Sequence, residues 1–189
     1  MAEETGADVA GTGTEDAAED EAAAETTPQK HGVPVTDSHG QEVLHPSREQ
    51  YRDVVEALGE EGYHVCIDVT AVDYLAHQHR EVAPGITPER FELVVLFLDH
   101  QHRRRTRLRV QVPEADPTVP SIVDLHPGTE AMEREVFDMF GVAFDGHPDL
   151  TRILMPEDWD GHPLRKDYAV GAIPVQFKGA GAERREEAP

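Results

Sequence analysis

The segment Glu133–Tyr168 constrains the fold more than any other, because its 36 residues show no regular apolar period. It reads EREVFDMFGVAFDGHPDLTRILMPEDWDGHPLRKDY, with charged, aromatic, glycine and proline residues closely interspersed. A long helix or a sheet buries apolar side chains at a fixed spacing, and this pattern does not supply that spacing. Specific contacts must therefore hold the segment in one shape. We expect its function to lie in contact with another surface.

The first 30 residues carry nine acids against one base, Lys30, and contain no aromatic residue. Such a stretch cannot bury enough apolar surface to offset its ordering entropy. We therefore predict a disordered acidic tail over residues 1–44 and a second disordered end over 179–189. The formal net charge of −21, without interleaved aromatic residues, also argues against a nucleic-acid partner.

Residues 45–143 predict one α+β domain, with helices packed on a mostly antiparallel or mixed sheet. The first helix is predicted over residues 45–62, where apolar residues recur on one face. Ser47 and Gln50 form a capping-box pattern at its start. The β-branched and aromatic run over residues 63–74 predicts the first strand.

Two further runs, residues 90–98 and 103–112, predict an antiparallel hairpin. The second run alternates, so Arg105, Arg107 and Arg109 fall on one face and apolar residues on the other. The arginine face has two interpretations. It is either a solvated charged face that discourages edge aggregation or a docking surface for an acidic partner.

The end of the predicted domain contains two helical segments. A short turn of helix is predicted over residues 118–125, between prolines. A longer helix is predicted over residues 130–140, with Thr129 as its N-cap and Gly141 as its end.

Cofactor and membrane motifs are sparse in this sequence. Cys66 is the only cysteine, which excludes an intrachain disulfide and an iron–sulfur cluster held by this chain's cysteines alone. Its apolar neighbours predict a small core residue. The longest apolar run, Leu93–Leu98, is far shorter than the ~20 residues that span a bilayer. No phosphate-binding glycine loop of the G-x-G-x-x-G or Walker type is present.

After the last predicted helix, we expect an extended arm over residues 144–178. The tetrapeptide Asp-Gly-His-Pro occurs in it twice, at Asp145–Pro148 and Asp160–Pro163. Asp-Gly favours a tight turn, and each proline restricts the histidine before it to extended conformations. Extended backbone needs hydrogen-bond partners, so we expect the arm to lie across a neighbouring subunit.

The same segment resembles the C-subunit family of the bacterial NADH:quinone oxidoreductase, respiratory complex I. The matching motifs are E-R-E, D-M-F-G, G-H-P-D-L, R-I-L-M-P and W-x-G-H-P-L-R-K-D-Y, which here occupy Glu133–Glu135, Asp138–Gly141, Gly146–Leu150, Arg152–Pro156 and Trp159–Tyr168. Two positions depart from the family pattern. Ala131 stands where the family usually has tryptophan, and Thr151 stands where it often has the first of two arginines.

The resemblance implies a hydrophilic subunit of the peripheral arm of a proton-translocating enzyme. Electrons would pass from NADH through FMN and iron–sulfur clusters on partner subunits to quinone, while this chain would bind no cofactor and would not be catalytic alone. Its main partner would be the quinone-site D subunit, beside iron–sulfur subunits. It would lie at the cytoplasmic side of the cell membrane as a peripheral protein, with membrane contact only through the complex.

Within that role we expect a partner interface made of charged, aromatic and turn-forming residues. The predicted members are Glu133, Arg134, Glu135, Asp138, His147, Arg152, Trp159, His162, Arg165, Lys166, Asp167 and Tyr168. Arg134 and Asp138 are four residues apart on the predicted helix, so an ion pair between them is geometrically available.

Two alternatives stay open at this point. One is the equivalent scaffold subunit of a complex-I-related membrane-bound hydrogenase. The other is a stand-alone metal-dependent hydrolase, for which the pairs His77/His79 and His100/His102 are the available ligands and Glu133 or Asp138 the available base. No HExxH frame accompanies those histidines.

Overall fold

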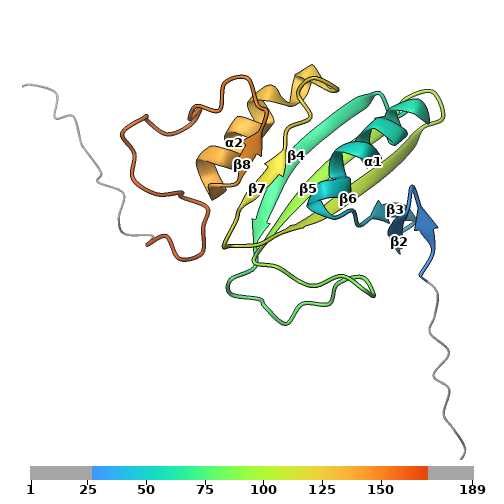
Figure 1. The fold of residues 1–189 in the computed structure, drawn as a ribbon, viewed down its shortest axis with the longest axis horizontal. Coiled ribbons are helices and arrows are strands. Elements are labelled where there is room, and N and C mark those ends of the chain that lie inside the picture. The colour runs from blue at the N-terminus through green and yellow to red at the C-terminus, as the bar shows by residue number, and fades with distance from the viewer. Residues whose placement is uncertain (1–26, 170–189) are drawn as a thin grey trace, which may run out of the picture.

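The computed structural model describes residues 27–169 of the chain (Figure 1). Its elements in chain order are β1 Gln29–Lys30, β2 Val33–Ser38, β3 Gln41–Leu44, α1 Arg48–Glu60, β4 Val65–Asp73, β5 Phe91–Asp99, β6 Arg104–Val112, β7 Thr118–Pro120, the 3-10 turn η1 Pro127–Thr129, α2 Glu130–Phe140 and β8 Ala143–Asp145. Residues 1–26 of the predicted acidic tail, residues 170–178 of the predicted arm and the predicted disordered end 179–189 lie outside the described part.

The strands form a six-stranded sheet in the order β1-β2-β3-β6-β5-β4. Only the β3–β6 pairing is parallel, so the sheet is mixed, and the predicted α+β class is confirmed. The predicted hairpin is the antiparallel pair β5–β6, with Phe91 opposite Val112 and Asp99 opposite Arg104. β7 and β8 form a separate parallel pair.

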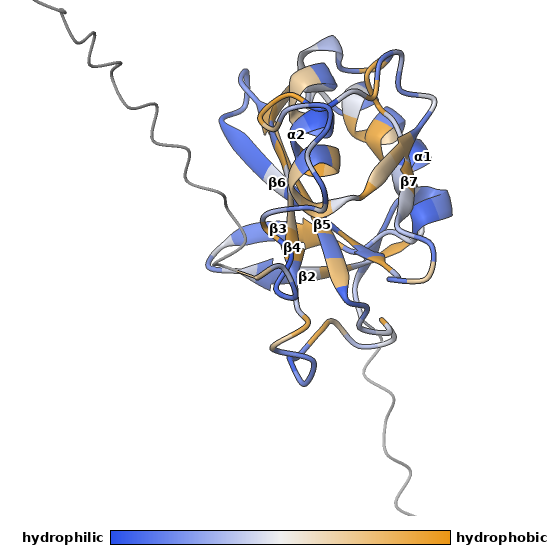
Figure 2. Cartoon of the chain, turned by 90° about the vertical axis from the view of Figure 1, so that its left-hand side faces the viewer, coloured by the Kyte–Doolittle hydropathy of each residue, from blue (hydrophilic) through white to orange (hydrophobic). Residues whose placement is uncertain are grey.

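Both helices pack on one face of this sheet around a single core. Every second residue of β5, from Phe91 to Phe97, is fully buried beneath them. Tyr51 of α1 and Val136 of α2 belong to the same apolar cluster. Figure 2 shows hydrophobic stretches, drawn in orange, on the strands of the sheet and on both helices. Alternation along β5 and β6 thus determines which sheet face becomes the core.

The predicted boundary of the acidic tail at residue 44 is wrong, because residues 29–44 form β1, β2 and β3. Each of their two turns is a His-Gly dipeptide. His31 and Gly32 have φ of 52° and 74°, and His39 and Gly40 have φ of 56° and 78°. Two successive residues of positive φ are typical of the tight turns that join antiparallel strands. These dipeptides are the sequence signal that could have revealed the hairpins.

Two local predictions near α2 also need correction. Thr118–Pro120 is a strand rather than a turn of helix, because it pairs with Ala143–Asp145. Thr129 immediately precedes α2, but its side chain makes no capping hydrogen bond there. Its hydroxyl donates instead to the carbonyl of His126, 2.9 Å away.

At the start of α1, the predicted capping box is present, with Ser47 and Gln50 exchanging side-chain to backbone hydrogen bonds. We expect Ser47→Ala to lower the free energy of unfolding by about 1 kcal/mol, because one amide loses its acceptor. Urea denaturation measures this. Ser47→Gly should cost only about a few tenths of a kcal/mol, because without a Cβ the N-cap leaves the amide open to water, which replaces the lost hydroxyl. Equal, large losses in both variants would contradict the capping role.

Candidate functional site

The C-terminal end of α2 receives the arm, and Asp138 is the centre of this junction. Its side chain is fully buried. One carboxylate oxygen accepts hydrogen bonds from the backbone amides of Ile153, Leu154 and Met155, at 3.0, 2.7 and 2.8 Å. The other accepts from the guanidinium of Arg152 at 2.6 Å. One acidic side chain of the helix therefore fixes four consecutive residues of the arm.

Arg152 extends this junction across the arm. Its Nη2 donates to the carbonyls of Trp159 and Gly161, at 3.0 Å each. Its Nη1 donates to the carboxylate of Asp138 and also to the main-chain carbonyl of Asp138, the latter at 3.3 Å. A planar guanidinium with several donors suits such simultaneous bonding, which lysine could not reproduce. Arg152 thus ties two turns of the arm to the helix end.

The electrostatics of Asp138 follow from these contacts. Burial alone would raise the pKa of its carboxyl, since it disfavours the charged form. The three amide donors and Arg152 outweigh that effect and hold the pKa below its ordinary value. Asp138 is therefore ionised at neutral pH, and its charge is compensated within the chain.

The arm also satisfies the last carbonyl groups of α2, which have no partner within the helix. His162 donates from Nδ1 to the carbonyl of Asp138 at 2.9 Å. The amide of Leu164 donates to the carbonyl of Met139 at 3.0 Å, and Nε of Arg165 donates to that of Phe140 at 2.6 Å. A cation near the helix C-terminus also interacts favourably with the helix dipole.

Gly141 makes this close approach possible. It ends α2 in the left-handed region, with φ of 71°. A Cβ at this position would lie 2.5 Å from Nε2 of His162 and 2.7 Å from Nη2 of Arg165. The glycine of D-M-F-G therefore serves both as the helix end and as the space into which the arm packs.

A second junction joins the arm to the sheet. Asp73, the buried last residue of β4, accepts from the amide of Lys166 at 2.9 Å and pairs with Arg90 at 2.9 Å. Arg90 also pairs with Asp167 at 2.9 Å. No sequence pattern pointed to Asp73 or Arg90, because the arm residues that they bind are distant along the chain.

Glu133 lies inside the domain, fully buried. Its carboxyl accepts from the hydroxyl of Ser121 at 2.6 Å and from the amide of Ile122 at 2.9 Å. Burial raises the pKa of this group above its ordinary value, although these donors and Thr129 act in the opposite direction. Glu133 thus connects α2 to the segment after β7 rather than to an outside surface.

Arg134 does not form the predicted ion pair with Asp138. Its Nε and Nη2 donate to the carbonyl and the hydroxyl of Thr151, at 3.1 and 2.9 Å. Its Nη1 reaches Glu130 at 3.5 Å, and Nη2 also donates to the carbonyl of Arg152. The threonine that departs from the family pattern supplies two of these acceptors.

The remaining predicted residues divide between arm contacts and exposed positions. His147 accepts from the amide of Asp149 at Nδ1, so its Nε2 carries the proton that is donated to the carbonyl of Glu130 at 3.2 Å. Trp159 is partly buried. The Tyr168 ring packs so closely on Gly161 that an added Cβ would lie 2.9 Å from it. The side chains of Glu135 and Lys166 are exposed.

The predicted interface residues thus fall into two groups: residues that bind the arm to its own domain and residues that are exposed. Most of the polar ones bind the arm to its own domain, which differs from the expectation that they reach a neighbouring subunit. Glu133 and Asp138 are fully buried and cannot present their side chains to a partner. Large apolar side chains of the arm are exposed instead: Ile153 at 41%, Leu154 at 55% and Leu164 at 46%.

The junction makes stability depend on pH through His162. Burial, with Arg165 and Arg152 nearby, lowers the pKa of this imidazole below 6.5. Between that lowered pKa and 6.5 the unfolded state binds more protons, so the free energy of unfolding falls as pH decreases below 6.5. We expect His162→Asn, which keeps a donor near Nδ1, to show a smaller decrease than wild type between about pH 6.5 and 5.5. Thermal melts across this range test it, and an unchanged slope would contradict the assignment.

Residues that could hold a metal do not gather in the described part of the chain. Between residues 27 and 169, no group of three histidine, cysteine or acidic side chains could hold an ion. His102 of the second histidine pair binds Asp99 through Nδ1 at 2.7 Å. Cys66 packs partly buried against the core, and burial raises the pKa of its thiol to about 12. Among the same residues, no helix has both the length and the apolar character needed to cross a membrane.

Comparison with known proteins decides the family. Residues 44–173 match the family model described as the respiratory-chain NADH dehydrogenase, 30 Kd subunit. The chain belongs to this family. The match covers α1, α2, the sheet from β4 onward and the whole of the junction between α2 and the arm. The resemblance inferred from the arm motifs is confirmed.

Relatives in this 30 Kd subunit family are named as the C subunit of NADH-quinone oxidoreductase. The one from Saccharopolyspora erythraea is 41% identical over 161 residues, which cover 80% of this chain and 61% of the relative. The one from Nocardioides sp. is 44% identical over 143 residues, covering 74% and 54%. The one from Acidothermus cellulolyticus is 42% identical, covering 75% and 70%. The chain thus spans between about half and seven-tenths of the length of these relatives.

Two solved structures share the fold. A trypsin-resistant fragment (1–134) of Nqo5 is 33% identical with a TM-score of 0.55, and the match covers 63% of this chain and 90% of the fragment. The membrane-bound sulfane sulfur reductase, described as an archaeal respiratory membrane complex, contains a chain with a TM-score of 0.61 at 21% identity, covering 74% and 79%. The second likeness shows the fold alone.

Proposed function

We propose that this chain is a non-catalytic subunit of the peripheral arm of a proton-pumping NADH:quinone oxidoreductase, where it braces the quinone-site subunit. Electrons would pass from NADH to quinone through FMN and iron–sulfur clusters on partner subunits. The family assignment and the names of the relatives support the complex. Membership in that peripheral arm would place the chain at the cytoplasmic side of the membrane, with membrane contact only through its partners.

The construction of the arm is the observation that carries the bracing role. Polar groups of the arm bind its own domain, through Asp138 at one junction and Asp73 at the other. Residues 146–169, which contain neither helix nor strand, are thereby held in one shape, and Ile153, Leu154 and Leu164 stay exposed. Rigid apolar side chains on a polar scaffold are typical of the centre of a stable protein interface.

The partner should therefore contact the arm mainly through apolar side chains. The exposed members of the predicted interface, Glu135, Lys166 and Asp167, would lie at its polar rim. We assign the quinone-site D subunit as the main partner and an iron–sulfur subunit as the neighbour. In this arrangement the ion pairs inside the arm preorganise the surface, and burial of the apolar residues supplies most of the affinity.

Co-purification tests the proposed function. The chain, tagged at its first residue, would be isolated from native membranes in mild detergent, and its companions identified by mass spectrometry. Flavin- and cluster-bearing subunits with NADH:quinone activity are the expected result. Recovery of hydrogenase subunits instead would show that the chain belongs to the related membrane-bound hydrogenase. A lone chain with hydrolytic activity would contradict the scaffold role.

Polar substitutions on the arm test which surface binds. We expect the double variant I153S/L154S to melt like wild type, because both side chains are already exposed, but to co-purify far less of its partner subunit. The matched control is V65S/I67S, which removes apolar side chains of similar exposure, 44% and 37%, from β4. Retention of the partner by the arm variant, or its equal loss in both variants, would contradict the apolar interface.

A further inference from the structure

The arginine face of β6 is only partly neutralised by the described residues. Arg109 pairs with the buried Glu92 at 2.7 Å. Arg103, Arg105 and Arg107 have no ion pair with any residue between 27 and 169. The Nε of Arg107 is buried, and no acceptor for it exists in that same range. The β5–β6 hairpin therefore carries positive charge that no residue between 27 and 169 neutralises.

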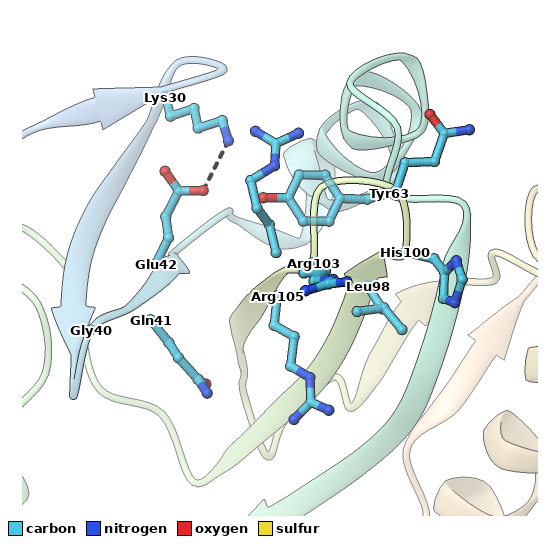
Figure 3. A pocket seen from close by; sticks show the side chains of 11 residues that line it. Lys30, Gly40, Gln41, Glu42, Tyr63, Leu98, His100, Arg103 and Arg105 are labelled. Carbon is cyan, nitrogen blue, oxygen red and sulfur yellow. Dashed lines mark hydrogen bonds and ion pairs between the residues drawn. The ribbon is translucent and has the colours of Figure 1, made fainter.

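Arg103 and Arg105 line a cavity of about 1060 Å³ at the tip of the β5–β6 hairpin (Figure 3). Tyr63 and Leu98 provide apolar surface within it. Its full lining consists of Lys30, Gly40, Gln41, Glu42, Tyr63, Leu98, His100, Gln101, Arg103, Arg104 and Arg105. Four of these residues are lysine or arginine, and one is acidic.

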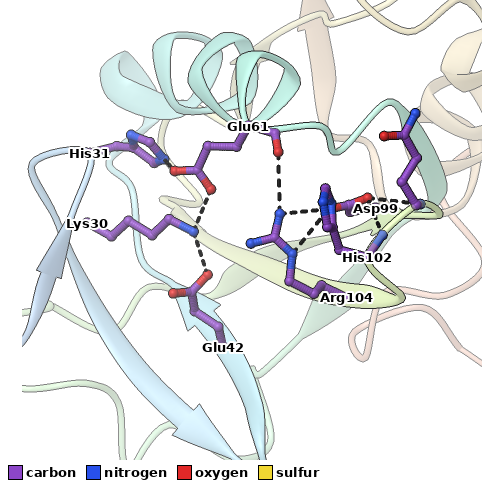
Figure 4. Close-up of polar contacts among 8 residues, drawn as sticks. Lys30, His31, Glu42, Glu61, Asp99, His102 and Arg104 are labelled. Carbon is purple, nitrogen blue, oxygen red and sulfur yellow. Dashed lines mark hydrogen bonds and ion pairs between the residues drawn. The ribbon is translucent and has the colours of Figure 1, made fainter.

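The other charges around this hairpin cavity are already paired (Figure 4). Lys30 lies 2.9 Å from both Glu42 and Glu61. Arg104 pairs with the buried Asp99 at 2.6 Å. Arg103 and Arg105 are therefore the excess charge of the cavity, and a ligand with several carboxylates would neutralise it through charge-assisted hydrogen bonds.

We propose that the acidic segment 15–25 of this same chain binds in the hairpin cavity, against Arg103 and Arg105. The segment contains six carboxylates: Glu15, Asp16, Glu19, Asp20, Glu21 and Glu25. It lies outside the described residues and ends close to the cavity along the chain, because Lys30 forms part of the lining. At ~3.5 Å per extended residue, the 11 Cα-to-Cα steps from Glu19 to Lys30 span up to about 38 Å.

Covalent connection and charge both favour this occupant over an external one. A tethered ligand has an effective concentration of roughly millimolar order, without any loss of translational freedom on binding. Residues 27–169 contain 26 acids against 14 lysine and arginine residues, so the domain as a whole repels the segment while the hairpin cavity attracts it. An acidic surface of another protein would have to displace the segment before it reached these arginines.

Paramagnetic labelling of the full chain tests the proposal. A nitroxide is attached at A23C in a C66A background, and amide signals are recorded with ¹⁵N-labelled protein. We expect signal loss concentrated at residues 100–106 in low salt. The loss should disappear at about 0.5 M salt, where screening shortens the range of charge interactions.

Charge variants decide whether the contact is specific. R103Q/R105Q should restore the signals to the diamagnetic level. The control R48Q/R52Q removes the same charge from α1 and should leave the loss unchanged. Within the tail, E19Q/D20N/E21Q should abolish the effect, and E3Q/E4Q/D8N should not. Absence of a localised loss in low salt, or a loss that persists in R103Q/R105Q, would overturn the proposal.

A second measurement avoids the cysteine changes, should C66A fail to fold. R105K introduces an amine into the hairpin cavity, and a zero-length carbodiimide reagent joins amines to carboxylates in direct contact. Peptide mapping should find that amine linked to Glu19, Asp20, Glu21 or Glu25. Links only to residues outside segment 15–25 would overturn the proposal as well.

Discussion

Asp138→Asn is expected to lower the free energy of unfolding by about 3 kcal/mol, because it leaves the guanidinium of Arg152 without its counter-charge. Arg152 is itself mostly buried, with 14% of its side chain exposed. The new amide group would also place an N–H donor against Arg152 or against the amides of the arm. Urea denaturation measures the loss. Trypsin cleavage after Arg165 should accelerate, because the arm loses one of its two junctions.

Glu135→Gln is the matched control for this substitution. It makes the same chemical change on the same helix, but its side chain is exposed, so we expect a change within about 0.5 kcal/mol. Wild-type stability and wild-type protease resistance of Asp138→Asn would show that the carboxylate does not hold the arm. Faster proteolysis with an unchanged domain transition would instead show that the arm opens separately from the core.

Gly141→Ala is expected to have a similarly large effect, about 3 kcal/mol, for a different physical reason. The backbone at this position has φ of 71°, which strains any residue with a Cβ. The added methyl group would also lie 2.5 Å from Nε2 of His162, whose Nδ1 is held by its hydrogen bond to the helix end. The melting temperature and the trypsin cleavage rate of the arm report both consequences.

Gly59→Ala provides the opposite expectation from the same chemical change. Gly59 lies within α1, has no heavy atom within 4 Å of an added Cβ, and shows no positive φ. Alanine there should stabilise the protein by roughly 0.5–1 kcal/mol, since it restricts the unfolded chain and favours helix. Destabilisation by both glycine substitutions alike would mean that the space at Gly141 is not the cause.

Asp138→Asn and Gly141→Ala together assess how the family motifs produce a binding surface. D-M-F-G supplies the buried carboxylate and the glycine, while R-I-L-M-P and G-H-P-L-R supply the donors that reach them. The charged residues of these motifs thus mainly make contacts within the chain. The apolar letters Ile153, Leu154 and Leu164 face outward, where we place the partner.

The sequence did not show whether the charged or the apolar residues of the arm would face outward. A charged residue in an irregular segment can face a partner or its own domain with the same local pattern. The expected pair of Arg134 with Asp138 follows from helix spacing alone, yet Asp138 finds three backbone amides and Arg152 instead. Their combined hydrogen bonds outweigh one exposed ion pair, which is worth about 0.3–0.5 kcal/mol.

Local features of this protein could be predicted from its residues alone. The capping box of Ser47, the β5–β6 alternation and the end of α2 at Gly141 depend on neighbouring residues, so spacing and residue type predict them. The motif run likewise identified the family. Strands β1–β3 were not predicted, because the acidic composition before them outweighed the signal of the two His-Gly turns.

The place where the arm binds, and which of its side chains remain exposed, followed from the tertiary structure alone. Asp73 and Lys166 are 93 residues apart, and Arg90 and Asp167 are similarly distant along the chain. Such contacts depend on how α2 and β4 pack on the shared core, and no local period encodes them. Which groups become buried and which hydrogen bonds they form depends on all neighbouring groups together, because the helices and strands must first pack against one another.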